Sequence, residues 1–126
     1  MKANLDISVF KSLARTVTEN SPDQLSDVYR GIRLTLDVTA VSGTTPTLDV
    51  KIQRLDPLSG KYVDLPSGAF SQKTGTGTDD LIIYPGISET ANRSVSDCLG
   101  RLWRAVATIG GTTPSFTFSL GATYIP

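Results

Sequence analysis

One stretch alternates apolar and polar residues without a break: Ile32-Arg33-Leu34-Thr35-Leu36-Asp37-Val38-Thr39-Ala40. Such alternation predicts a half-buried β-strand, because successive side chains of a strand point to opposite faces of the sheet. The pattern resumes after the turn-forming segment 42–46, and the two runs together predict a β-hairpin with a longer loop. The residues expected to face the core are Ile32, Leu34, Leu36, Val38, Ala40, Leu48, Val50 and Ile52.

A second pair of alternating runs lies at 101–109 and 115–124, again with Gly, Thr and Pro between them. The segment 43–50 matches 111–118, since both contain Gly-Thr-Thr-Pro followed by alternation. We interpret this internal similarity as two copies of one hairpin. The inward residues expected here are Trp103, Ala105, Ala107, Ile109, Phe116, Phe118, Leu120, Ala122 and Tyr124.

Turn signals divide the rest of the chain into short strands at 12–18, 61–65, 69–73 and 81–84, whereas 87–100 has no clear period and predicts a loop with at most one helical turn. Seven or eight short strands with turns between them are typical of two packed sheets. We therefore predict an all-β fold, an antiparallel β-sandwich (jelly-roll or Ig-like) of about 7–8 strands. Residues 1–12 are expected to form an N-terminal arm and residues 13–126 a single domain.

Composition favours the same class and weakens most enzyme hypotheses. The 126 residues include sixteen Thr and thirteen Ser, and the twelve Lys and Arg balance twelve Asp and Glu. Zero net charge argues against nucleic-acid binding, which depends on clustered cations. The absence of His removes the usual general base and the commonest metal ligand. No apolar stretch is long enough for a membrane span, and no secretory leader is recognisable.

No pattern predicts catalysis or a cofactor. The Gly-rich segment 74–78 is followed by Asp79 and Asp80, whose charge would repel phosphate, so a mobile loop is expected. Cys98 has no His to activate it and is expected to be a buried or half-buried small residue. Three arginines near Trp103 are a weak signal for single-stranded nucleic acid, and a solvated strand edge or subunit contact is favoured. We expect no enzyme activity, no cofactor and no metal.

Three segments resemble parts of small virion proteins of tailed bacteriophages: 38–50, 64–70 and 109–118. The resemblance covers roughly residues 30–120. It implies a non-enzymatic structural protein, most like a capsid decoration (cement) protein, which is made in the host bacterial cytoplasm and binds the outside of the mature head. The implied partner is the major capsid protein, and no catalytic residue is carried over.

The expected arm supplies the candidate contacts with the capsid or a neighbouring copy. Isolated apolar residues there have no evident hairpin partner, and we name Leu5, Ile7, Val9 and Phe10. A homotrimer is also expected, because such parts commonly sit at three-fold positions.

Two other functions stay open. A neck or tail protein of the same virion would be present in far fewer copies. A carbohydrate-binding adhesion module would need exposed aromatic residues along one face, yet most aromatic residues fall at inward positions or at strand ends.

Overall fold

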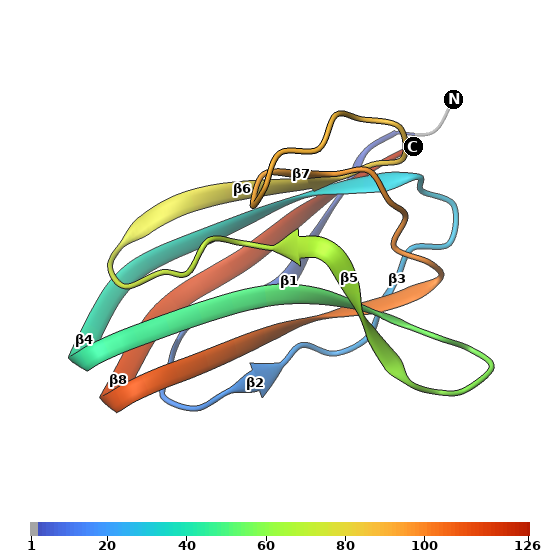
Figure 1. Cartoon of the computed structure of the whole chain (residues 1–126). Coiled ribbons are helices and arrows are strands. Elements are labelled where there is room, and N and C mark those ends of the chain that lie inside the picture. Colours follow the sequence, from blue (N-terminus) through green and yellow to red (C-terminus); the bar gives the residue numbers. More distant parts are fainter. Residues whose placement is uncertain (1–2) are drawn as a thin grey trace.

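Two long antiparallel strands form the centre of the fold in this computed structural model, which describes residues 3–126. Strand β4 (Gly31–Leu55) pairs with β8 (Leu102–Ile125) along almost its whole length. The pairing begins with Gly31 opposite Ile125 and ends with Arg54 opposite Trp103. Figure 1 shows the two ribbons running side by side.

The remaining strands extend this central pair into one eight-stranded sheet. The main order is β1-β8-β4-β6-β7, while β2 and β3 pair with β8, and β5 pairs with β4. Among the strands of residues 3–126, only β6 and β7 run parallel to each other, and every other pair is antiparallel. The expectation of an all-β fold is thus confirmed. The other strands are β1 (Leu5–Arg15), β2 (Glu19–Asn20), β3 (Gln24–Leu25), β5 (Tyr62–Ala69), β6 (Gly77–Ile83) and β7 (Ser94–Val95).

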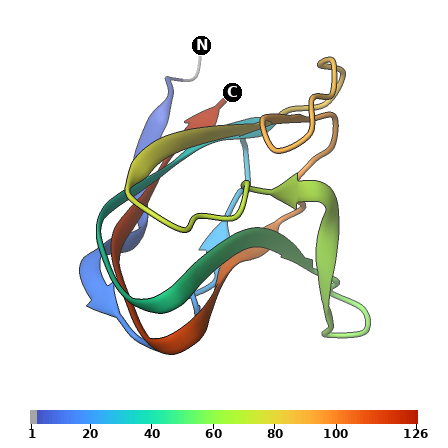
Figure 2. The same ribbon diagram turned by 60° about the vertical axis from the view of Figure 1, so that its left-hand side comes forward.

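The two hairpins predicted around 43–46 and 111–114 are wrong. Both Gly-Thr-Thr-Pro segments are corners inside continuous strands, and they pair with each other, with Thr44 opposite Thr112. The strand register shifts on each side of Thr44, and both strands turn at this place (Figure 2). The repeat therefore does not mark two hairpins. The two segments are alike because they lie opposite each other and both strands bend there.

Backbone geometry explains the choice of residues at these corners. Gly43 and Gly111 both have φ of 112°, a region that residues with a Cβ rarely adopt. A Cβ on Gly43 would lie 2.7 Å from the carbonyl oxygen of Thr113, and one on Gly111 would lie 2.7 Å from that of Thr45. Each glycine thus permits a close approach of the opposite strand.

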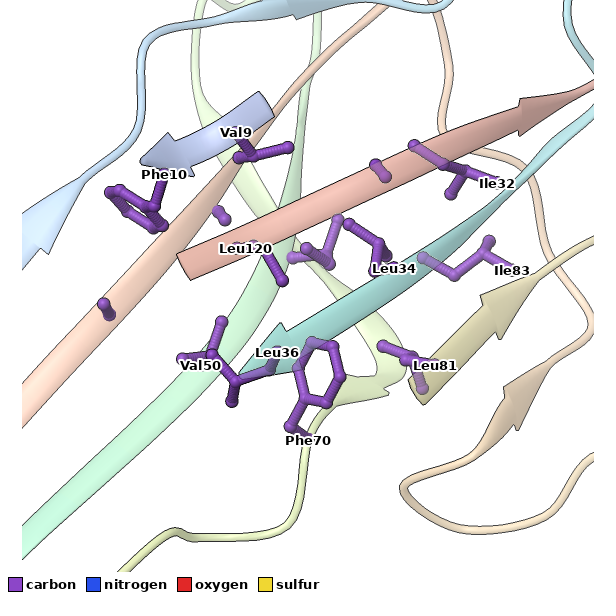
Figure 3. Packing of buried hydrophobic residues seen from close by; sticks show 14 of the residues in the cluster. Val9, Phe10, Ile32, Leu34, Leu36, Val50, Phe70, Leu81, Ile83 and Leu120 are labelled. Atoms are coloured by element: carbon purple, nitrogen blue, oxygen red, sulfur yellow. The ribbon is translucent and has the colours of Figure 1, made fainter. Parts of the chain in front are cut away.

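Beyond the corner, the two halves of the bent sheet contribute to one hydrophobic core. Leu34 and Leu36 precede the corner in β4, and Leu48 and Val50 follow it, yet all four are buried in the same cluster. Figure 3 shows Leu36, Val50, Leu81 and Phe70 close together. Alternation in the sequence therefore predicted the core well. The exceptions are Ala40, which is exposed beside the corner, and Ile109, which is only half-buried.

Other predicted boundaries shift. A loop was expected over 74–80, but strand β6 begins at Gly77. The loop therefore covers only 74–76, and Asp79 and Asp80 lie in the strand. Strand β5 extends to Ala69, beyond the expected end at 65. The separate strand expected at 69–73 does not form; Lys73 makes a single β-bridge to Leu48. Residues 87–100 are mostly loop, as predicted, with β7 inside them. Cys98 is exposed, contrary to prediction.

A buried hydrogen bond ties the two ends of β8 together and gives a first prediction. The indole Nε1 of Trp103 donates to the Tyr124 hydroxyl over 3.0 Å, and both side chains are buried. Trp103→Phe should lower the free energy of unfolding by about 1–3 kcal/mol, because the hydroxyl is left without its donor. Tyr124→Phe, measured alone and combined with Trp103→Phe by urea unfolding, is the control. Losses that simply add would contradict a direct coupling of the two groups.

Candidate interaction surface

The segment expected to be an arm is a strand of the sheet. Residues 5–15 form β1, which pairs with β8 from Leu5 opposite Tyr124 to Arg15 opposite Phe116. The arm was expected because residues 1–12 showed no strand partner in the sequence, and this is wrong for residues 5–12. The expected boundary between residues 12 and 13 falls inside β1. Met1 and Lys2, the start of the expected arm, lie outside the described residues.

The four candidate contacts divide into two kinds. Val9 and Phe10 are buried and belong to the core of their own chain. Phe10 packs edge-on against Phe118, with ring centroids 5.6 Å apart, and both Val9 and Phe10 are seen beside Leu120 in Figure 3. Leu5 is 45% exposed, and Ile7 is half-buried because part of its side chain packs against the same core. Of the four, only these two can still touch another molecule.

Two further apolar residues on or next to β1 are exposed and were not among the predicted contacts. Leu13 is 51% exposed and Val17 is 69% exposed. Leu13 follows register shifts at 8–10 and 10–13, which disturb the alternation that would have identified it, and Val17 lies two residues beyond the end of β1. We call Leu5, Ile7, Leu13 and Val17 the β1-edge surface.

Strand β1 is an edge strand of the sheet. One of its sides pairs with β8, and no strand among residues 3–126 pairs with its other side. An eleven-residue edge with exposed leucines is open to pairing with a strand of another molecule. The two register shifts and the exposed Lys11 and Asp6 limit such pairing, as they do in other edge strands.

Beside this edge, a crevice of about 290 Å³ separates β1 from the segment that follows it. One of its lining residues is Arg15, whose side chain is only 7% exposed. The guanidinium donates to the carbonyl oxygens of Lys11, Leu13 and Phe118 at 2.9–3.1 Å and pairs with Glu19. Because these bonds join both sides of the crevice, Arg15 holds β1 in place rather than offering a free cation.

The acidic pair flagged in the sequence is fully engaged. Asp79 forms an ion pair with Lys73 over 3.0 Å, and Asp80 forms one with Arg33 over 3.2 Å. Thr35 also donates its hydroxyl to Asp80 over 2.7 Å. These contacts lie beside a polar hollow of about 370 Å³ and join neighbouring strands, which is a structural role.

The aromatic residues offer no stacking platform. Trp103 and all four Phe are buried, and Tyr29, Tyr62 and Tyr84 are half-buried. Arg104, one of the three arginines near Trp103 in sequence, lies over the Tyr62 ring at 3.5 Å from its centroid. Residues 3–126 therefore present no exposed aromatic side chain on which a base of single-stranded nucleic acid or a sugar ring could stack.

Over the same described range, no three His, Cys, Asp or Glu residues gather closely enough to hold a metal ion. No helix in this part of the chain is long and apolar enough to cross a membrane. Comparison with known proteins finds no matching family model, no matching curated protein and no matching solved structure.

Proposed function

We propose that the protein is a structural component of a tailed-phage virion, a decoration (cement) protein that binds the outside of the mature head. The observation that carries the proposal is the β1-edge surface, where one side of β1 has no strand partner, Leu5 and Leu13 are exposed on the strand, and Val17 is exposed just beyond its end. Such an edge can add a strand or an apolar segment of a neighbouring protein. The resemblance of three segments to small virion proteins supplies the context.

In this proposal the partner is the major capsid protein, the protein resides on the capsid surface, and it is not an enzyme. A protein that binds only the assembled shell stabilises the shell by mass action. Copies that are held together in one oligomer and bind neighbouring sites at once can stay bound through modest individual contacts. Three copies would meet as a homotrimer at three-fold positions of the shell.

We also propose that the fold is a two-layer antiparallel β-sandwich, of jelly-roll or Ig-like type. The support is that both halves of the bent sheet contribute side chains to one core. In sandwiches the inner faces of two sheets interdigitate in the same manner. Here a single pair of strands, β4 and β8, would serve both layers by passing through the corner.

Copy number tests the proposed place in the virion. Quantitative mass spectrometry of purified particles, calibrated on the major capsid protein, should find hundreds of copies for each particle. A dozen copies or fewer would move the protein to the neck or tail. Absence from particles would reject the virion proposal and reopen the carbohydrate-binding alternative, for which the described residues offer no exposed aromatic ring.

The role of the β1-edge surface has its own test. Leu13→Asp should weaken binding to purified shells at least about tenfold, because it places a charge in the apolar contact. The same change at Val63, an exposed residue of β5, is the matched control and should leave binding unchanged. Cosedimentation of labelled protein with shells measures both. Equal binding of Leu13→Asp and wild type would contradict the assignment of this surface.

A further inference from the structure

A second apolar surface lies at the end of the sheet where β3, β8, β4 and β5 meet. A pocket of about 280 Å³ opens there, which we call the end pocket, and Leu25 lies beside it because it pairs with Leu102. Leu25 is 49% exposed. The pocket is lined by Arg54, Leu55, Pro57, Gly100, Arg101 and Leu102.

Next to the end pocket, a tight turn presents Leu58 to solvent. This leucine is 96% exposed, the highest value among the large apolar side chains of residues 3–126. The turn holds it firmly: Ser59 donates both its backbone N–H and its hydroxyl to the Asp56 carboxylate, and Gly60 donates its N–H to the Asp56 carbonyl. Because these hydrogen bonds already fix the backbone of the turn, binding does not have to order that segment.

Charge surrounds both features. Arg54 and Arg101 line the pocket, and neither forms a salt bridge with any described residue. Asp56 lies at the base of the turn, and the hydrogen bonds from Ser59 lower the pKa of its carboxyl group. This surface therefore has Leu58 projecting beside the anionic Asp56, and next to it the apolar end pocket lined by the cationic Arg54 and Arg101.

We propose that this surface binds a second copy of the chain about a two-fold axis, with Leu58 of each copy in the end pocket of the other. A two-fold contact brings the same patch together from both sides, so the patch must complement itself. The projection and the hollow are adjacent, since Pro57 lines the pocket and precedes Leu58. Asp56 of one copy would then face Arg54 or Arg101 of the other, which fixes the register of the pair.

This pairing is independent of the proposed virion role. The end pocket shares no residue with the β1-edge surface, and the pairing concerns the free protein in solution. It also differs from a homotrimer, which needs two different surfaces of each copy to meet.

Sedimentation velocity of the purified protein tests the pairing, with reductant present because Cys98 is exposed. Across loading concentrations from about 1 µM to about 1 mM, the mass should rise to twice the 13.4 kDa of one chain. Leu58→Asp should raise the dissociation constant at least about tenfold, since it puts a charge into the partner's apolar pocket. Arg101→Glu should weaken pairing too, and added salt should weaken the wild-type pair.

Leu13→Asp is the matched control, because it makes the same change at an exposed leucine on the other surface and should leave the pair intact. A monomeric mass at every concentration would overturn the proposal. So would any oligomer, including a trimer, whose mass is unchanged by Leu58→Asp. Circular dichroism of each variant must match the wild type, and Leu25→Asp provides a second disruption beside the pocket that does not alter the turn.

Discussion

Gly43→Ala is expected to lower the free energy of unfolding by about 3 kcal/mol or more, a large share of the stability of a domain this size. Two effects add up. A residue with a Cβ is strained at φ of 112°. The new Cβ would also lie 2.7 Å from the Thr113 carbonyl oxygen and 2.8 Å from the Pro114 Cα, and backbone atoms cannot move aside unless the corner opens.

Urea unfolding of three alanine variants separates these effects. Gly60 has φ of 71° with no atom within 4 Å of its would-be Cβ, so Gly60→Ala reports strain alone and should cost about 1 kcal/mol. Gly121 has open space and no positive φ, so Gly121→Ala should change stability by no more than about 1 kcal/mol in either direction. Gly111→Ala should match Gly43→Ala, because the two glycines make equivalent contacts. A cost for Gly43→Ala no greater than for Gly60→Ala would refute the close packing of the corner.

The corner also shows where sequence reasoning stops. Local alternation correctly predicted most inward residues of 32–52 and 103–124, because every second residue of a half-buried strand faces the core. The sequence of one strand does not determine which other strand it pairs with. A Gly-Thr-Thr-Pro segment between two alternating runs fits a hairpin loop and a bend equally well, and only the distant matching segment decides between them.

The candidate surface was only partly predictable, for a related reason. The apolar character of 5–10 marked the segment as important, and Leu5 and Ile7 do remain accessible. Whether such residues face a partner or the chain's own core depends on pairing with β8, nearly the whole chain away. The two register shifts in β1 then place Leu13 at the surface, and no local pattern records such shifts.

Arg15→Ala should lower the free energy of unfolding by about 3 kcal/mol, because it removes a nearly buried guanidinium that donates several hydrogen bonds, one of them to the buried Phe118 carbonyl oxygen. Three carbonyl oxygens and the Glu19 carboxylate would lose their donor at once. The guanidinium also lies over the rings of Phe10 and Phe118, with its carbon 5.0 and 4.6 Å from their centroids, so packing is lost as well. In the sequence, Arg15 was one polar residue in a weakly alternating run.

Two variants identify which feature of Arg15 matters. Lys11→Ala removes an exposed cation from the same strand and should cost no more than about 0.5 kcal/mol. Arg15→Lys keeps the charge, yet an ammonium cannot reproduce the planar fork that reaches three carbonyls, so it should still cost about 2 kcal/mol. Hydrogen exchange adds the location: because Arg15 joins β1 to β8 and to Glu19, amides of 5–15 should lose protection before those of β4. Uniform loss across the sheet would instead mean that β1 is an inseparable part of the core, and the β1-edge surface would then be as rigid as the core beneath it.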